Sequence, residues 1–442
     1  DIDVDGTTNL DVVDIDGAVD MASTLTVAGV LTGASLDISG DVDIDGTLNV
    51  DAIDCDGALD VNAAGANIVA TFTSTDSVGG IKLVDNAGNV ELTAVGNVFQ
   101  VQPAGGVATF KVSTTDLSTP TAGTSNVRLG VNAGNSIASG GNFNTVVGDE
   151  AGTAITTGDD NTFIGYASGD ATTTGANNTA VGESAASTVT TASNNTAIGA
   201  DSLRLTTTGA NNVAVGFAAL EANTTASNNV AVGFTALLAN TTGTRNTAVG
   251  TEALKTVITG VDCAALGYRA LKLNTGNSNT GLGSNALETN SSGSANTAVG
   301  AAALFANTTG ALNTAMGSGA LIANTTGASN TAVGAGALDE NTTGGNNVAL
   351  GADALSVNTT GDANTAIGED SLKANTTASN NTAVGRRAMF ANTTGTDNVA
   401  FGHNALDANT TANNNTAIGH DALTANTTGT GSTAVGSASL DA

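Results

Sequence analysis

The chain has 442 residues, of which 12% are charged, 3% aromatic and 40% hydrophobic, with 57 Gly, 2 Pro and no Trp. The apolar residues are mostly Ala, Val and Leu, which suit a thin core repeated along an axis better than a wide globular core. Forty acidic residues against eleven basic ones leave a formal charge of −29. This balance argues against a nucleic acid partner, because phosphate binding relies on clustered Lys and Arg.

Other classes are disfavoured by what the sequence lacks. It contains no run of about 18 apolar residues, so we expect no membrane insertion. It opens at Asp1 without Met or a signal peptide, and we expect a processed or truncated start. Cys55 and Cys263 lie in different regions and suggest neither a disulfide framework nor a zinc site.

Residues 1–62 alternate Asp with Ile, Val or Leu. The strings are DIDVDG at 1–6, DIDG at 14–17 and 43–46, and DCDG at 54–57. Alternation of this kind predicts short strands with one apolar face. One chain would bury too little to stand alone. We therefore expect several copies to intertwine as an Asp-rich β shaft.

The same segment opens with a metal-binding pattern. Asp1, Asp3 and Asp5 followed by Gly6 match the start of an EF-hand calcium loop. Position twelve of such a loop is a bidentate Glu, but here it is Val12. Strand alternation with outward Asp explains the string without metal. A calcium site is the alternative interpretation, and no other cofactor is expected.

Residues 63–125 lose the repeat and predict a small β connector module. IVATFTS, GIKLVDNAGNVELTAV, NVFQVQP and VATFKVST are typical of four or five strands. An Asn-Ala-Gly hairpin is expected at 86–88. The stretch beginning at Thr119–Thr121 is predicted to join this module to the next region.

Residues 126–442 carry a seventeen-residue repeat. After an early, irregular coil that begins at Asn126, the repeat runs from Gly148 with one step that is a residue short. The consensus is N-T-A-V-G-x-x-A-L-x-A-N-T-T-G-x-x, and its first glycine falls at Gly148, Gly165, Gly182, Gly199, Gly216, Gly233, Gly250, Gly267, Gly283, Gly300, Gly317, Gly334, Gly351, Gly368, Gly385, Gly402, Gly419 and Gly436. A fixed period of this kind predicts a solenoid. With about 4.8 Å per coil, the rod would be roughly 85 Å long.

Two apolar columns predict the core. The residue before each glycine is large and apolar, as in Val147, Ile164, Val181, Met316, Leu350 and Phe401. It alternates with Ala or Gly, so we expect a strand with the large residue inward. A second column, from Leu203 to Leu423, predicts a second inward position. Each coil would then be two short strands joined by two turns.

Glycine and asparagine columns predict the corners. Gly243, Gly310, Gly327 and Gly361 are expected to supply a positive φ, with Ala192 and Ala226 as exceptions. Stacked coils would align the Asn residues into hydrogen-bonded ladders. The ladder residues and their partner glycines include Asn178, Gly182, Asn246, Gly250, Asn330 and Gly334, and a second Asn column includes Asn223, Asn240, Asn307, Asn324 and Asn392.

The NTAVG coils of 126–442 resemble the head repeats of trimeric autotransporter adhesins, whose shorter repeats form a left-handed parallel β-roll in a homotrimer. The stretches DIDVDGTTNLDV and LTVAGVLTGASLDISGDVDIDGTLNV look like repeats of bacteriophage tail fibres. The period here is longer than in the adhesins, and no coiled-coil stalk or membrane anchor is present in this sequence. Both resemblances imply a trimeric extracellular fibre that contacts a cell surface.

Several side chains are candidates for recognition or metal binding. Tyr166, Phe217, Phe234 and Tyr268 share one variable position, where aromatic rings could stack on a glycan, although scattered exposed apolar residues are common. His403 and His420 occupy equivalent positions in adjacent coils. We favour solvated side chains over a metal site for this pair, because no acidic or Cys column accompanies it consistently.

Further motifs have a structural and a functional interpretation. The N-T-T strings fit the N-glycosylation sequon but are also required by the turn. A Thr plane would suit ice binding, yet the triplet lies at a corner and fails at Thr188-Val189. Between Gly250 and Gly283 the repeat breaks, which predicts a kink. Asp262, Tyr268 and Arg269 in this break are the alternative binding spot.

These observations predict an all-β, fibrous homotrimer without enzymatic activity, since two His and two Cys form no nucleophile and base constellation. The expected function is that of a structural fibre of a virus tail or cell surface, giving reach and attachment. A bacterial surface adhesin and a monomeric ice- or glycan-binding solenoid are the alternatives. The expected partners are further copies of the chain and a cell-surface receptor, of which a glycan is one candidate.

Overall fold

The computed structural model describes residues 78–84, 89–95, 98–103, 110–113 and 122–441. The Asp-rich shaft predicted for 1–62 and the strand predicted at IVATFTS lie outside the described residues. So do Asp1, Asp3 and Asp5, and the calcium hypothesis therefore stays a prediction.

A small antiparallel sheet lies within the predicted connector. Its strands are β1 (Val78–Val84), β2 (Asn89–Val95), β3 (Val98–Pro103) and β4 (Phe110–Ser113), in the order β1-β2-β3-β4. Val84 pairs with Asn89, so β1 and β2 are joined across the 85–88 segment where the hairpin was predicted. Each strand pairs with its neighbour in sequence, as in a β-meander.

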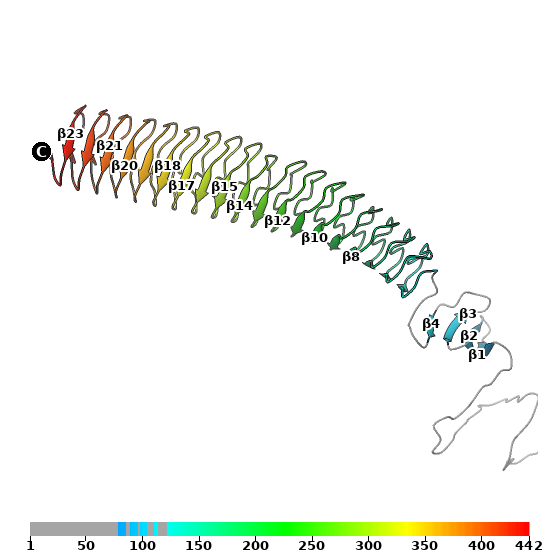
Figure 1. Ribbon diagram of the computed structural model, residues 1–442. Helices are drawn as coiled ribbons and strands as arrows, with labels where there is room; N and C mark the ends of the chain where they lie inside the picture. The colour runs from blue at the N-terminus through cyan, green and yellow to red at the C-terminus, as the bar shows by residue number, and fades with distance from the viewer. Residues whose placement is uncertain (1–77, 85–88, 96–97, 104–109, 114–121, 442) are drawn as a thin grey trace, which may run out of the picture. The chain divides into compact units, whose positions relative to one another are not determined.

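Residues 122–441 form a parallel β-solenoid, which confirms the predicted all-β repeat fold. Its strands are three residues long: β5 Val127–Leu129, β6 Thr145–Val147, β7 Thr162–Ile164, β8 Thr179–Val181, β9 Thr196–Ile198, β10 Val213–Val215, β11 Val230–Val232, β12 Thr247–Val249, β13 Ala264–Leu266, β14 Thr280–Leu282, β15 Thr297–Val299, β16 Thr314–Met316, β17 Thr331–Val333, β18 Val348–Leu350, β19 Thr365–Ile367, β20 Thr382–Val384, β21 Val399–Phe401, β22 Thr416–Ile418 and β23 Thr433–Val435. Figure 1 shows these strands side by side in one row of stacked coils.

The strand ladder is open and follows chain order. Among the described residues β5 pairs only with β6, and β23 only with β22. Val213 pairs with Val230, seventeen residues on, and this offset recurs from β6 onward, whereas Val127 of β5 pairs with Thr145, eighteen residues on. The offset falls to sixteen between Ala264 and Thr280, where the sequence drops a residue. Each coil therefore places equivalent residues directly above one another.

Each coil contains one strand, so the prediction of two strands per coil is wrong. We number the repeat from its first Asn, so that the strand covers positions 2 to 4 and the following glycine is position 5. The second apolar column is position 9, and it lies in a turn. Leu203, Leu220 and Leu237 there have φ of 51°, 52° and 52°, which no strand residue adopts. The Leu220 backbone N–H still donates to Ala236 O of the next coil at 3.0 Å, so coils are hydrogen-bonded at the turns as well.

The large residue before each glycine points outward, contrary to the prediction. In β8 the small residue Ala180 is fully buried, whereas Val181 is partly exposed, and from β6 to β23 the middle residue of the strand is always the buried one. The interior of a coil is filled by Leu at position 9 and Ala at positions 3 and 8, as with Leu304, Ala298 and Ala303. A coil this thin has no space for a second large side chain opposite the leucine.

The first coils show that side-chain volume decides this arrangement. Phe163 takes position 3 in β7 and is fully buried. Position 9 of that coil is Gly169, where a Cβ would come within 2.6 Å of the Phe163 ring. The large and the small residue have exchanged positions, which conserves the filled volume at the close packing of protein interiors.

Two columns of buried Asn side chains bind successive coils together. At position 1, Asn178 donates its backbone N–H to Asn161 Oδ1 (3.0 Å) and its Nδ2 to Ala192 O (2.9 Å). Asn246 and Asn330 make the equivalent pairs of bonds. At position 12, Asn240 Nδ2 donates to Asn223 Oδ1 (3.3 Å) and to Gly243 O (3.0 Å). Where successive coils carry Asn at the same position, each supplies a donor and an acceptor to the column. Asn240 Oδ1 is without a partner among the described residues, because Val257 replaces the Asn of the next coil.

Glycine recurs at positions 5 and 15 for different reasons. At position 5, Gly182, Gly250 and Gly334 have φ of 134°, 133° and 137°. A Cβ on Gly250 would also lie 2.4 Å from Gly267 O of the next coil. At position 15 the predicted positive φ is wrong, because Gly243, Gly310, Gly327 and Gly361 do not adopt it. There the constraint is close approach, since a Cβ on Gly243 would lie 2.3 Å from Gly260 O.

Within the part of the chain that the structure describes, no helix is long and apolar enough to cross a membrane.

We predict that the inward and outward positions of β17 respond oppositely to enlargement. Ala332→Leu should lower the free energy of local opening by about 1–3 kcal/mol, because the filled interior cannot take the added carbons. The matched outward change Val333→Leu should alter it by less than about 0.5 kcal/mol. Hydrogen exchange of the β16–β18 amides measures both. A larger loss in Val333→Leu would contradict the orientation.

Candidate functional site

The outer face of the solenoid sheet carries an apolar stripe, defined as the position 4 residues from Val147 to Val435. Its members are Val, Ile, Leu, Met and Phe, and all are partly or largely exposed. Ile164, Leu266 and Phe401 are 39%, 52% and 56% exposed. Position 2, on the same face, is mostly Thr, with Val in four strands and Ala264 in β13. The sequence prediction missed this stripe because it assigned these residues to the core.

The predicted aromatic residues lie at position 6, which we call the variable column. Tyr166, Phe217, Phe234 and Tyr268 are 47–52% exposed, as a recognition surface requires. The rings of Phe217 and Phe234 stack at 5.6 Å between centroids. Other residue types occupy the coils between Tyr166 and Phe217 and the coil between Phe234 and Tyr268. The structure thus brings two of the four rings together.

The break between Gly250 and Gly283 places its charged residues in separate pairs. Asp262 accepts hydrogen bonds from Arg245 at 2.6 and 3.0 Å. Arg269 bonds Glu252, and its guanidinium lies 4.9 Å from the centre of the Tyr268 ring. Asp262 and Arg269 therefore belong to two different ion pairs, and the predicted binding site of Asp262, Tyr268 and Arg269 does not form as a single cluster.

Cys263 replaces an Asn of the first ladder. Its side chain is 1% exposed, and burial raises the pKa of the thiol. The sulfur lies 3.3 Å from Gly276 O, where the replaced amide would donate. In the coil after the break, Asn279 Nδ2 instead donates to Asn274 Oδ1 at 2.9 Å, which links the two ladders. The shortened step is thus compensated by a bond between columns.

Glu252 is the centre of a cationic cluster that joins two coils. Its Oε1 accepts from Lys255 Nζ (2.7 Å), while Oε2 accepts from Arg269 Nε (2.8 Å) and lies 3.1 Å from Lys272 Nζ. Lys255, followed by Lys272 and Arg269, lowers the pKa of the Glu252 carboxyl to about 2. Glu252 and Arg269 are seventeen residues apart and therefore occupy equivalent positions in adjacent coils. Opposite charges at that spacing were the sequence signal from which this ion pair could have been predicted.

The other basic residues of the central solenoid are paired as well. Every Lys and Arg between residues 204 and 387 lies within 4.0 Å of a carboxylate oxygen, including Arg204 with Glu221, Lys373 with Asp370 and Arg386 with Glu369. Because their charges are compensated, they present no free basic patch for an anionic ligand over this span.

The N-T-T strings serve the turn. Their Asn is position 12, and Asn223, Asn307 and Asn392 are fully buried with bonded side chains. The Thr224 hydroxyl donates to Thr241 O of the next coil at 3.1 Å. A glycan needs an accessible Asn amide, so these sequons are not glycosylation acceptors in the folded solenoid.

His403 and His420 stack in the variable column with ring centroids 5.1 Å apart. Asp421 adds a carboxylate that the sequence prediction did not include. It follows His420 directly and so lies at position 7, outside the column that contains the two His residues. One ligand atom from each of the three residues lies within 4.8 Å of the other two. Among the described residues this is the group that could hold a metal ion.

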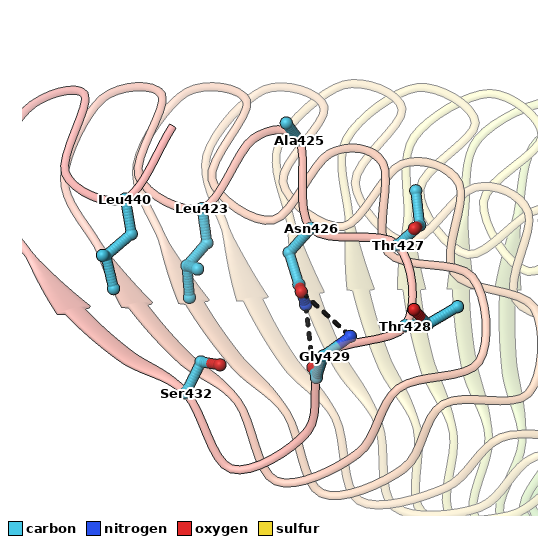
Figure 2. A pocket seen from close by; sticks show the side chains of 8 residues that line it. All are labelled: Leu423, Ala425, Asn426, Thr427, Thr428, Gly429, Ser432 and Leu440. Atoms are coloured by element: carbon cyan, nitrogen blue, oxygen red, sulfur yellow. Dashed lines mark hydrogen bonds between the residues drawn. The ribbon is translucent and has the colours of Figure 1, made fainter. Parts of the chain in front are cut away.

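A hollow of 330 Å³ lies over the last coil (Figure 2). Asn426 and Gly429 on its wall are bonded to each other by two hydrogen bonds of 3.0 and 3.1 Å. Leu423 and Leu440 also line it. These are repeat positions 12, 15 and 9, which are buried in earlier coils. The hollow is therefore the interior of the repeat at its last coil, with no chemistry of its own.

Comparison with protein-family models, curated proteins and solved structures finds no match to this chain. The functional argument therefore depends on the geometry above.

We predict that Glu252 makes stability depend on pH. Its pKa in the folded chain, about 2, is below the ordinary 4.5, so its ion pairs stabilise fully above pH 4.5 and are lost as the pH falls towards 2. Local opening of β12 and β13, followed by hydrogen exchange in the wild type and in Glu252→Gln, should differ at pH 6 and converge near pH 2.

Glu183→Gln is the matched control, since Glu183 forms no ion pair within the described residues. It should leave the opening of β12 and β13 unchanged at both pH values. A Glu252→Gln difference that persisted at pH 2 would contradict the charge-pair interpretation.

Proposed function

We propose that the chain is a non-catalytic structural fibre that associates as a homotrimer and gives a virus tail or cell surface its reach and its attachment to a host or another surface. The observation that carries this proposal is the apolar stripe. It continues from β6 to β23 on one face of the sheet. Exposed apolar patches of this extent are uncommon on soluble monomers and mark interaction surfaces.

The length of the stripe favours stable association. Covering about 40 Å² of apolar surface per coil would contribute about 1 kcal/mol. Over the eighteen strands β6–β23 the sum is about 18 kcal/mol, before side-chain ordering is subtracted. Loss of translational and rotational freedom costs about 4–15 kcal/mol, so a stripe of only roughly three or four coils would be too short.

The regularity of the stripe favours copies of the same chain as partners. One apolar side chain recurs per coil, at the spacing of neighbouring strands of about 4.8 Å. A partner can match that spacing along the whole rod only if it has the same axial repeat. A second copy has it. The number three comes from the resemblance to adhesin heads and tail fibres.

The variable column supports a separate recognition role. It lies next to the stripe, beyond the position 5 glycine, and its residues change from coil to coil far more than those of the core columns. Exposed rings such as those of Phe217 and Phe234 suit stacking on a glycan. An extracellular receptor is therefore the partner that we propose for this surface.

The first test is the mass of the native particle by light scattering. We expect about three times the 42.5 kDa of one chain. Loss of this mass on adding a calcium chelator would support the Asp1, Asp3 and Asp5 loop as a structural site. A mass of one chain would contradict the fibre and favour the ice-binding alternative, for which the outward Thr of position 2 is the supporting observation. Thermal hysteresis would then be measured.

A second prediction tests the stripe as the interface. In a Cys55→Ser background, Met316→Cys on the stripe should be linked between chains by a short bifunctional maleimide. Leu312→Cys is the control, because Leu312 is exposed (64%) but lies at position 17, outside the stripe. Equal linking of both, or linking of the control alone, would exclude the stripe as the interface.

A further inference from the structure

The end of the variable column contains two imidazoles and a carboxylate in one place. His403 and His420 are position 6 residues of successive coils, and strand pairing between β21 and β22 sets their separation. Their rings are inclined by only 15° with centroids 5.1 Å apart, so the two imidazoles stack nearly in parallel. Asp421 follows at position 7. Its backbone N–H donates to His403 O at 3.0 Å, which holds the three residues in register.

The carboxylate of Asp421 is oriented by two neighbours. Oδ2 lies 2.8 Å from His420 Nδ1, and Oδ1 accepts from Asn404 Nδ2 at 3.0 Å. His403 Nδ1 is buried and has no hydrogen-bond partner within the described residues. The His403 ring is therefore not held by a protein hydrogen bond at this nitrogen, and a metal ion bound at its other nitrogen would fix the tautomer of the ring.

From this geometry we infer a transition-metal site made by His403, His420 and Asp421, which clips two coils together. The ligand atoms lie within 4.8 Å of one another. Ligands on one tetrahedral ion are about 3.3 Å apart, with metal to nitrogen distances of about 2.0–2.1 Å, so small side-chain rotations close the site. The His420 side chain is 60% exposed, which leaves the rotation and the entry of the ion unhindered.

The donor set selects the class of ion. Two imidazole nitrogens and one carboxylate oxygen suit Zn²⁺, Co²⁺, Ni²⁺ or Cu²⁺, whereas Ca²⁺ and Mg²⁺ prefer oxygen ligands alone. The net charge of −29 favours any cation at the surface. Arg386 precedes His403 in the variable column, but its charge is compensated by Glu369 at 3.2 Å. Water completes the coordination on the exposed side.

The test is titration of the tag-free full chain with Co²⁺ and Zn²⁺ at pH 7.5, followed by calorimetry and by the visible spectrum of bound Co²⁺. We expect one ion per chain, retained in excess Mg²⁺. His403→Ala, His420→Ala and Asp421→Asn should each weaken binding at least tenfold. Circular dichroism confirms that each variant is folded, and Asp421→Asn preserves the shape of the side chain.

Asp201→Asn is the control for non-specific binding of metal ions to surface carboxylates. Asp201 is also at position 7, but it lies in a coil remote from the proposed site, where it pairs with Arg204. This substitution should leave the affinity unchanged. Equal losses in Asp201→Asn and Asp421→Asn, displacement by Mg²⁺, or unchanged binding in His420→Ala would each overturn the site. None of these outcomes depends on whether the chain is a trimeric fibre.

Discussion

The stacking of each coil on the next, at an offset of seventeen residues in all but two steps, is the constraint on which the structure depends. Strand pairs and turn bonds such as Leu220 N–H to Ala236 O hold every coil one strand spacing from its neighbour. A side chain then meets its own equivalent above and below. Asn can occupy the interior because it supplies the donor and the acceptor that such a column needs, and Gly250 must be glycine because the backbone of the next coil occupies the space of a Cβ.

A thin coil limits what can be buried. One Leu and two Ala fill the cross-section, and the exchange of Phe163 and Gly169 shows that the total volume is the conserved quantity. The larger apolar residues of each strand, such as Met316 and Leu350, are consequently on the outside. The small interior of each coil thus places large apolar side chains on the surface through which, in our proposal, several chains assemble.

Most of the variation between coils lies where side chains point away from the stack. Positions 6, 7 and 10 carry the aromatic residues, the Glu252 cluster and the His403–His420 pair. Equivalent positions of successive coils are adjacent in the stack. A side chain at one of these positions therefore lies beside the side chain seventeen residues away in the sequence. Local chemistry can therefore arise from two changes in sequence without any alteration of the core. This is why candidate sites lie on the column beside the stripe.

The sequence by itself determined the period, the parallel stacking, the shortened step after Gly267 and the two Asn columns, because a strict repeat leaves few other ways to satisfy buried amides. Only the tertiary structure decided which residue of each strand faces inward. Ala and Val are both apolar, so alternation alone is compatible with either face, and a shift of one residue exchanges the two. The left-handed backbone of Leu220 and the hydrogen bond from the Asp421 N–H to His403 O were decided by the same stacking, since each involves the turn of a neighbouring coil that no local pattern specifies.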